Sequence, residues 1–264
     1  MAMSPRKRAQ TSRIVQYAIL IVAAAAAAFV TDWQTVGEKF FNPTVALQQF
    51  PGVVTTALKN TIIYTALGFV LALALGLLLA LMKISSVGPY RWLATLYIEF
   101  FRGVPALLVF IAFGYAVPFA FGIRLDTYVT VMLSLGIVAS AYIAETLRAG
   151  LQAVPKGQYE AARSLGMSHT RAMISIVIPQ AIRIILPPLT NEIIMMTKDS
   201  SLIYLLGLTA SQYELAKFGR EAISSPEAGL TPLVIAGAAY LVITVPLGIL
   251  ARRFESRTAK LSRP

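Results

Sequence analysis

Long apolar blocks dominate the pattern of hydrophobic and polar positions along the chain. A helix that crosses the hydrocarbon core of a bilayer needs about 20 predominantly apolar residues. Six stretches approach or exceed this length, and they comprise residues 14–30, 55–82, 92–121, 128–147, 184–208 and 232–250. The pattern therefore predicts an all-α integral membrane protein with about six transmembrane helices.

The second and third blocks, residues 55–82 and 92–121, are longer than a simple span requires. We expect each of them to include an interfacial or tilted portion. Gly103 and Pro105 lie inside the third block, and proline removes a backbone donor and crowds the preceding helical turn. The third span is therefore predicted to bend at this point.

Lysine and arginine placement predicts the orientation of these spans. Basic residues gather before residue 14, at Lys83 and Arg91, throughout 148–183 and in the tail from Arg252 onward. Segments 31–54 and 209–231 are close to neutral. Because cytoplasmic loops carry an excess of lysine and arginine, the basic segments are expected inside the cell and the neutral ones outside. Both termini are then cytoplasmic, which requires an even number of spans.

The composition agrees with a membrane environment. Only 13% of the residues are charged and 57% are hydrophobic, with a mean hydropathy of +0.70, whereas a soluble domain carries roughly 25% charged residues. The net charge of +11 does not indicate nucleic-acid binding, because the positive charges cluster at the ends of the apolar blocks. No cysteine is present, and His169 has no neighbours that suggest a metal site.

The first apolar block could also be a cleaved signal peptide. It follows the basic residues Arg6, Lys7, Arg8 and Arg13, and its alanine run at 23–28 offers possible cleavage sites. We favour a retained span, because removing it would leave five spans and place the new N-terminus outside.

Small residues repeat every four positions at Gly68, Ala72 and Gly76, and less clearly at Ala139 and Ile143. Such spacing lets helix backbones approach closely. The stripe could serve packing within the chain or contact with a second subunit.

The loop 148–188 predicts helix, glycine turn, helix. Residues 158–165 are good helix formers, and Gly166 suits a left-handed helix end. Ser168 suits the N-cap of a second helix, which Pro179 should disturb. Apolar side chains on one side of this loop indicate a surface that docks against another protein.

Within this loop the spacing resembles a known signature. Glu160-Ala161-Ala162 is followed after three residues by Gly166 and after nine more by the run 176–179, which ends in Pro179. This resembles the EAA signature of importer permeases of the ATP-binding-cassette (ABC) superfamily, which ends in isoleucine, any residue, leucine, proline. Ile178 stands where leucine is usual.

Four further runs resemble the polar amino acid branch of this family. They are FRGVP at 101–105, AETLRAG at 144–150, LPPLTNE at 186–192 and KDSSL at 198–202. Val104 replaces the threonine that is usual in the first run. The branch usually has five spans, so the span at 14–30 is an addition to the shared core.

The resemblance implies a five-helix type I importer core at 55–252, preceded by an extra helix and external segment within 1–54 and followed by a basic tail at 253–264. It implies a multi-pass protein of the bacterial cytoplasmic (inner) membrane. The loop would form a coupling helix that docks into a cleft of a cytoplasmic ATPase subunit. The implied coupling residues are Glu160, Ala161, Ala162, Leu165, Gly166 and Pro179.

The implied partners are two ATPase subunits, a second permease subunit, membrane lipid and an extracytoplasmic amino-acid-binding protein. The chain contains no G-x-x-x-x-G-K-[S/T] phosphate loop, so ATP and Mg²⁺ are expected on the partner ATPase and no cofactor on this chain. Glu160 could pair with a basic group of that partner or simply stabilise its own helix N-terminus.

Polar residues inside predicted spans are candidates for a substrate pathway, because charges at mid-membrane usually face a cavity or each other. The candidates are Asn191, Glu192, Lys198, Asp199, Ser200, Ser140 and Tyr142. The alternative is a buried structural network between the fourth and fifth spans. Glu145 and Arg148 are expected to form an ion pair at a helix end. Arg102 is expected to be interfacial or to cap a helix.

The expected function is therefore that of a permease subunit, in which ATP hydrolysis on separate subunits drives alternating access and import of polar amino acids. A self-sufficient secondary transporter would more often show internal repeats, and no nucleophile with a base, metal cluster or cofactor motif supports a membrane enzyme. Neither the amino acid nor the choice between homodimer and heterodimer follows from the sequence.

Overall fold

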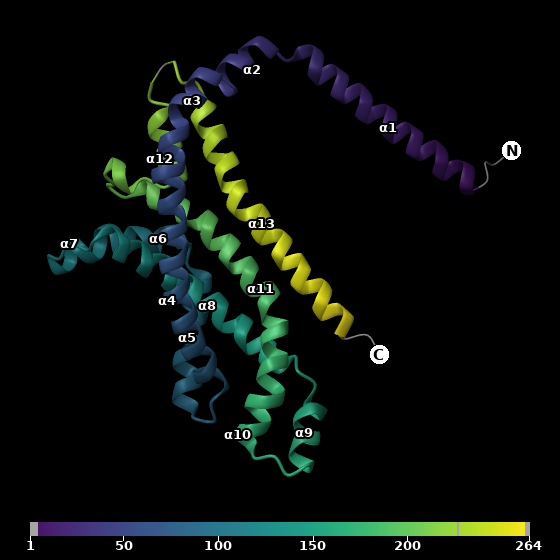
Figure 1. Ribbon diagram of the computed structural model, residues 1–264, viewed down its shortest axis with the longest axis vertical. Helices are drawn as coiled ribbons and strands as arrows, with labels where there is room; N and C mark the ends of the chain where they lie inside the picture. The colour runs from purple at the N-terminus through teal and green to yellow at the C-terminus, as the bar shows by residue number, and fades with distance from the viewer. Residues whose placement is uncertain (1–4, 226, 262–264) are drawn as a thin grey trace.

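The computed structural model describes residues 5–225 and 227–261, and within them the chain forms helices and connections without a β-strand (Figure 1). The α-helices are α1 (Pro5–Val30), α2 (Trp33–Phe40), α3 (Pro43–Gly52), α4 (Lys59–Ile84), α5 (Gly88–Gly103), α6 (Ala106–Ile111), α7 (Val117–Phe121), α8 (Thr127–Gln152), α9 (Lys156–Ser164), α10 (His169–Ala172), α11 (Ile178–Asp199), α12 (Leu215–Ala222) and α13 (Thr231–Leu261). Between them lie the π-helical stretches η1 (Val53–Leu58), η2 (Ala112–Ala116) and η3 (Met173–Val177), and the 3₁₀ stretches η4 (Ser200–Leu205) and η5 (Ala210–Gln212).

The six predicted spans are confirmed by length and composition. Five helical runs could cross a membrane, and they are Ala9–Val30, Trp33–Ile84, Thr127–Gln152, His169–Leu205 and Thr231–Arg257. The sixth is a bent pair, α5 with the helix from α6 through α7, whose two parts meet at 101°. The bend lies at Val104 and Pro105, as Gly103 and Pro105 predict.

Proline shapes two of the long helices through a widened turn. Pro118 and Pro179 each lie two residues after a π-helical stretch. Proline cannot donate to the carbonyl four residues earlier and its ring crowds that carbonyl, so a wider turn relieves the clash. Pro179 therefore disturbs its helix as predicted but does not end it, because the helical run continues from His169 to Leu205.

Helices α4 and α8 pack closely through their small residues. A side chain at Gly68 would lie 2.7 Å from the Leu135 Cβ, and one at Gly76 would lie 2.8 Å from a methyl of Ile143. Ala72, between these glycines, is fully buried. The four-residue stripe therefore serves packing within this chain.

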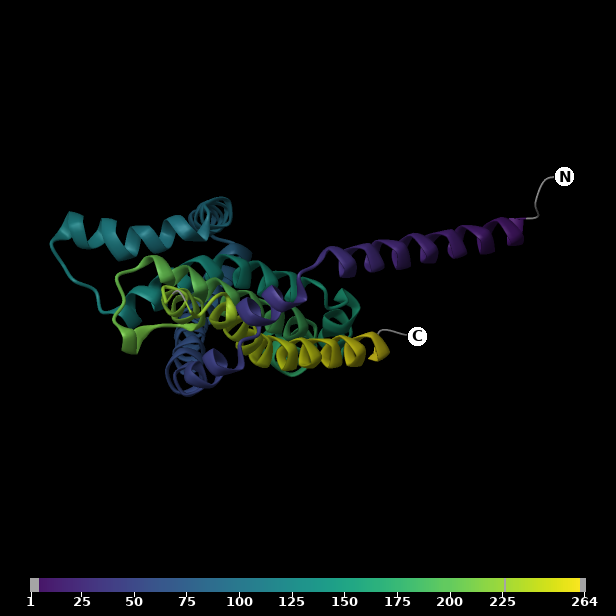
Figure 2. The same ribbon diagram turned by 90° about the horizontal axis from the view of Figure 1, so that it is seen from above.

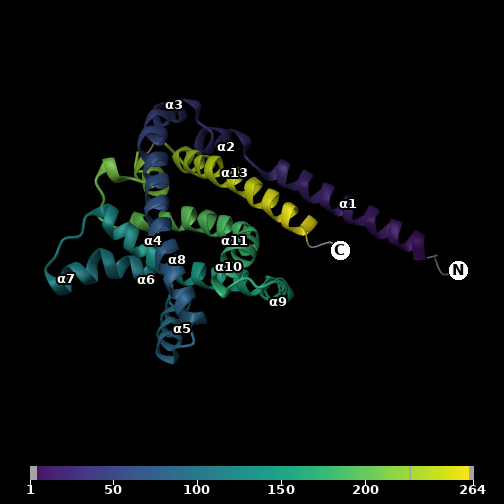
Figure 3. The same cartoon turned by 60° about the horizontal axis from the view of Figure 1, so that its bottom comes forward.

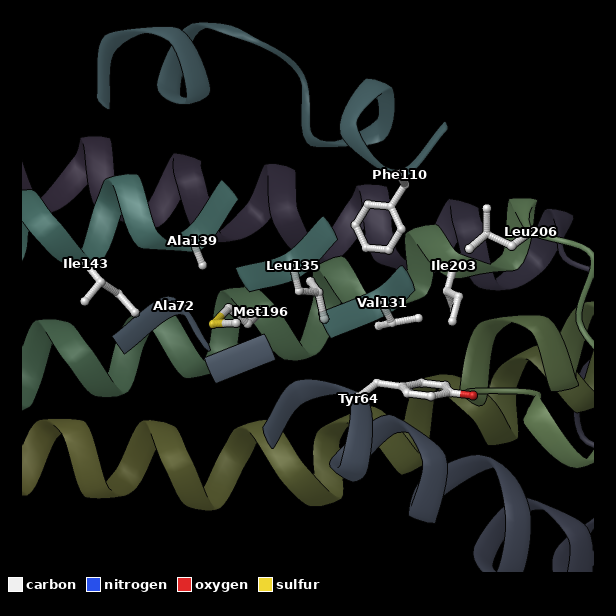
Figure 4. Close-up of a cluster of buried hydrophobic side chains, with 10 residues drawn as sticks. All are labelled: Tyr64, Ala72, Phe110, Val131, Leu135, Ala139, Ile143, Met196, Ile203 and Leu206. Carbon is white, nitrogen blue, oxygen red and sulfur yellow. The ribbon is translucent and has the colours of Figure 1, made fainter. Parts of the chain in front are cut away.

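The main core joins α4, α6, α8, α11 and η4 (Figure 4). Its buried side chains are Tyr64, Ala72, Phe110, Val131, Leu135, Ala139, Ile143, Met196, Ile203 and Leu206. Because residues from 64 to 206 meet in this cluster, the spans α4, α8 and α11 form one body.

Helix α1 projects away from this body (Figure 2). None of its apolar window is buried against the rest of the chain. Helices α2, α3 and α12 gather at one end of the bundle, and α9 and α10 lie at the opposite end (Figure 1). Turned so that this second end comes forward, the structure shows α9 and α10 side by side, away from α7 (Figure 3).

Candidate functional site

The turn between α9 and α10, which we call the elbow (residues 156–172), closes through local hydrogen bonds. The Met167 N–H donates to the Ala162 carbonyl at 3.2 Å, and the Gly166 N–H donates to the Arg163 carbonyl at 3.0 Å. Gly166 has φ +83°, a left-handed conformation that favours glycine. This is the Schellman arrangement of a helix end, so the predicted glycine turn is confirmed.

Side chains brace the two arms of the elbow. The Tyr159 hydroxyl lies 2.9 Å from His169 Nδ1, and their rings meet edge to face. The Ser168 hydroxyl accepts from the Arg171 N–H, which confirms the predicted N-cap. Hydrogen bonds thus hold the glycine turn, join Tyr159 to His169 and close the Ser168 N-cap. With this support the elbow can move as a rigid unit.

Five of the six predicted coupling residues lie on the elbow, and the sixth, Pro179, lies beyond it in α11. Leu165 lies at the tip of the elbow, and 85% of its surface is exposed. Ala162 is buried and Ala161 is exposed. Glu160 is exposed and lies beyond the first turn of α9, which contains no acidic residue, so the position does not favour a helix-capping role.

The elbow rests on the ends of α8 and α11. Val154, Val177, Ala181 and Ile185 form a buried cluster to which Tyr159 adds its ring. Beside it lies a groove of about 560 Å³, lined by Leu151, Gln152, Val154, Pro155, Lys156, Tyr159, Glu160, Met173 and Val177. A force on the elbow would therefore reach both spans through packed side chains.

A cavity of about 530 Å³ lies where the α5–α6 bend meets α8 and α11. Its lining comprises Arg102, Gly103, Val104, Pro105, Ala106, Phe110, Leu135, Val138, Ala139, Tyr142, Glu192, Met195, Met196 and Asp199. Residues 102–106, at the bend, form one wall of this space.

Opposite charges face this cavity. The Arg102 guanidinium lies over the Tyr142 ring, 5.6 Å from its centroid, a cation–π geometry that orients the arginine. Glu192 and Asp199 are seven residues apart on α11, so they share one face about 10 Å apart along the axis. The cavity can thus present a bidentate donor and two carboxylates within an otherwise apolar lining.

The other predicted pathway residues do not line this cavity. Asn191 and Lys198 are exposed and are not part of its lining. Ser140 is buried against α5, where its hydroxyl lies 2.9 Å from that of Tyr97. Ser200 is buried and donates to the Thr197 carbonyl at 2.7 Å. Three of the seven candidates, Tyr142, Glu192 and Asp199, therefore meet in one place.

Arg102 lines the cavity, although the sequence did not single it out as a pathway candidate. We expected an interfacial or capping role, and the structure places its side chain on the cavity wall. The available signal was a charged residue next to the glycine and proline of a predicted bend inside an apolar block.

The expected pair of Glu145 and Arg148 is confirmed and has a further member. Arg148 Nε and NH2 donate to one Glu145 oxygen at 2.9 and 2.6 Å. The other oxygen forms a short ion pair with Lys83 of α4. Glu145 thereby joins the ends of α4 and α8 on the side of the elbow.

At the opposite end, a loop that we call the cap (residues 209–215) is held by polar side chains of α4. Asn60 donates to the Ser211 and Tyr213 carbonyls, both at 2.9 Å. The Tyr64 hydroxyl donates to the Gln212 carbonyl at 2.9 Å. These contacts join segments about 150 residues apart, and no sequence motif predicted them.

Glu214 is the one ionisable residue of the cap that is completely buried. Its carboxylate accepts from the Ala216 and Lys217 N–H groups, both at 2.6 Å, and from the Tyr240 hydroxyl at 2.9 Å. Burial raises the pKa of Glu214 to about 7, although these hydrogen bonds favour the ionised form. The sequence reasoning did not single out this residue.

Comparison with known proteins gives consistent matches over this bundle. The model of a family described as binding-protein-dependent transport system inner membrane component matches residues 72–260. The probable glutamine ABC transporter permease protein GlnM of Bacillus subtilis (strain 168) is 40% identical over 201 residues, which cover 75% of this chain and 91% of that relative. The arginine transport system permease protein ArtQ of the same organism is 30% identical over 214 residues, covering 81% and 95%.

A solved structure matches as well. A chain from the crystal structure of an amino acid ABC transporter with histidines has a TM-score of 0.71 and 37% sequence identity, and the match covers 80% of this chain and 96% of that one. Helices α1, α2 and α3 precede the residues that the family model matches.

Proposed function

Because the chain belongs to the binding-protein-dependent inner membrane components, the permease subunits of ABC importers, we propose that it moves polar amino acids into the cell with ATP hydrolysed on separate subunits. The relatives are named for glutamine and for arginine, which supports the substrate class without selecting one amino acid. ATP and Mg²⁺ belong in this proposal to the partner ATPase.

The single observation that carries the coupling role is the exposed apolar tip of a braced turn. Leu165 offers a large apolar side chain to a partner, and the hydrogen bonds around Gly166 fix its position. An ATPase that grips this tip would push a unit that is packed onto α8 and α11. The elbow is therefore cytoplasmic in this proposal, and both termini lie on the same side.

Replacing Leu165 with glutamate tests this role. The side chain buries little within the chain, so Leu165→Glu should leave the permease folded while an apolar docking contact is lost. We expect the ATPase subunits to co-purify at a small fraction of the wild-type amount and ATP-driven uptake to fall at least tenfold. Leu165→Met is the matched control and should retain both.

Unchanged co-purification and uptake in Leu165→Glu would refute the docking role. Uptake by the purified chain alone, driven by an ion gradient without ATP, would instead establish a self-sufficient transporter.

The cavity supports a substrate pathway of defined chemistry. A zwitterionic amino acid needs a donor for its carboxylate, and the Arg102 guanidinium can supply two parallel hydrogen bonds. It also needs acceptors for its ammonium group, and Glu192 and Asp199 face the same space. Asn191, Lys198, Ser200 and Ser140, which lie outside this cavity, remain candidates for other points of the pathway.

Substitutions of Arg102 test the role of the cavity. In proteoliposomes that contain the assembled transporter, we expect Arg102→Gln to lower amino-acid uptake at least tenfold, because a charge-assisted contact is worth about 1.5–3 kcal/mol. Arg102→Lys should retain part of the uptake. Lys198 lies outside the cavity, so Lys198→Gln is the matched control. ATP hydrolysis should persist in all three variants, so a failure here would not affect the coupling role. Equal uptake by wild type and Arg102→Gln would exclude this arginine from the pathway.

In the assembled importer we expect two ATPase subunits, a second permease subunit and an extracytoplasmic amino-acid-binding protein. The last of these would meet the end of the bundle that carries α3 and α12, opposite the elbow. Binding measurements on that protein would identify the amino acid, because it supplies much of the selectivity.

A further inference from the structure

The connection between α1 and α3 contains a short amphipathic helix, α2, that neither the elbow nor the cavity uses. Trp33, Val36 and Phe40 recur at spacings of three and four residues, so they share one side of the helix. Gln34 and Glu38 lie on the other side, where the Gln34 amide donates to the Glu38 carboxylate at 3.0 Å. The eight residues therefore present one apolar face and one polar face.

Much of the apolar face is left uncovered by the described part of the chain, although Val36 is partly buried. Trp33 is 63% exposed, and α2 contains no buried residue. Phe41, which follows the helix, is also 63% exposed. Large aromatic side chains grouped in this way mark a surface that meets something other than water.

Although much of its apolar face is uncovered, α2 is held in place at both ends. Asp32 accepts from the Gln34 and Thr35 N–H groups, and the Trp33 indole donates to the Ala28 carbonyl at 2.8 Å. At the other end, the Lys39 carbonyl accepts from the Leu230 N–H at 2.6 Å. The helix is therefore a fixed element between two spans.

The position of α2 relative to the spans identifies its partner. The apolar run Ala9–Val30 ends three residues before Trp33, and the run Thr231–Arg257 begins one residue after Leu230, which bonds Lys39. The helix thus lies at the level where two spans end, at the α3–α12 end of the bundle (Figure 1). Tryptophan and other aromatic residues are enriched at that level, where an apolar ring and a polar group both find suitable surroundings.

We propose that α2 is a membrane-interface helix that lies along the bilayer surface with Trp33, Val36 and Phe40 in the boundary between headgroups and acyl chains. Its charged pair Glu38 and Lys39 is neutral overall, so the apolar face and not an anionic lipid provides the attraction. The helix then fixes the C-terminal end of α1 relative to the bundle, since α1 buries none of its apolar window against the chain. The proposal concerns residues that precede the family match and does not depend on the transport mechanism.

Tryptophan fluorescence can measure the depth of α2, because the chain contains only Trp33 and Trp92. Trp92→Phe leaves Trp33 as the sole tryptophan in the full chain, reconstituted in phosphatidylcholine vesicles. We expect a nitroxide near the headgroup to quench Trp33 at least twice as strongly as one at the end of the acyl chain, and aqueous acrylamide to quench it weakly. Trp33→Phe, which leaves Trp92, is the matched control for reconstitution.

Three results would overturn the proposal. Stronger quenching by the deep nitroxide would place α2 within a span. Strong acrylamide quenching with none by either lipid label would place it in water. Shielding from all three quenchers would place it against protein, such as a second copy of the chain.

Single cysteines give a second measurement that keeps both tryptophans, because the chain has no cysteine of its own. Spin labels at residues 36 and 40 should be more accessible to oxygen than to a water-soluble nickel complex. Labels at residues 34 and 38 should show the opposite preference. Equal accessibility at all four positions would contradict an interfacial helix.

Discussion

The elbow and the cap are both tight turns beside a short helix, but their supports differ. In the elbow, the Met167–Ala162 hydrogen bond and the Tyr159–His169 contact join residues five and ten positions apart. In the cap, Asn60 and Tyr64 of α4 reach residues 211–213, about 150 positions away. The elbow is thus a self-contained unit, whereas the cap exists only when several spans have assembled.

This difference fits the coupling role that we propose for the elbow and a tying role for the cap. A part that passes motion to its spans benefits from internal bonds that survive a rigid-body shift. A part that ties spans together benefits from bonds that cross between them, and Glu214 adds such a bond to Tyr240 of α13. Changes in the elbow should therefore affect transport more than stability, and changes in the cap should do the reverse.

The largest effect is expected at Gly166. Valine at φ +83° is strained by the backbone itself, since no other atom lies within 4 Å of the added Cβ. Gly166→Val should lower ATP-driven uptake at least tenfold with little change in the midpoint of thermal unfolding of the bundle.

Two variants test whether the backbone angle is the cause. Gly166→Asn should retain most uptake, because asparagine tolerates the left-handed region. Gly157→Ala, at an open helical position of α9, should leave uptake unchanged. Full uptake by Gly166→Val would show that the turn does not transmit the motion.

A smaller effect, on stability and dependent on pH, is expected in the cap. Burial raises the pKa of Glu214 from 4.5 to about 7. A carboxyl group whose pKa is higher in the folded than in the unfolded chain binds its proton more tightly when folded. Its stabilising contribution is therefore complete below about pH 4.5 and is lost as the pH rises through about 7, a change on the order of 3 kcal/mol.

The test is the midpoint of thermal unfolding in detergent between pH 5.5 and 8. It should decline more steeply for wild type than for Glu214→Gln, whose amide does not titrate. Lys217 and Tyr240 also face this carboxylate. Glu221→Gln, at the exposed partner of Lys217, is the matched control and should decline like wild type. Parallel profiles for wild type and Glu214→Gln would show that Glu214 does not bind a proton in this window.

The sequence predicted the elbow better than it predicted the cavity or the cap, and locality explains why. Gly166, Ser168 and the helix before them act through neighbours in the chain, so turn and capping preferences suffice. Arg102 meets Tyr142 only after the bend folds α5 against α8, and short-range patterns do not contain that contact. The six spans were predictable from apolar length alone, and the bend from Gly103 and Pro105, but the side of α11 that faces a cavity was not.

The smallest effects are expected when a single tyrosine hydroxyl group is removed from the cap or from the elbow. Tyr64→Phe removes the hydroxyl that donates to the Gln212 carbonyl from a fully buried ring. This should lower the free energy of unfolding by about 1 kcal/mol and leave uptake per hydrolysed ATP unchanged. Tyr159→Phe removes the bond to the exposed His169, which water can replace, so its stability should change by less than about 0.5 kcal/mol. Uptake per hydrolysed ATP should fall only in Tyr159→Phe, because the Tyr159–His169 contact holds the unit that we propose transmits motion. A fall in that ratio for Tyr64→Phe, or a larger stability loss for Tyr159→Phe, would contradict the division of roles between the cap and the elbow.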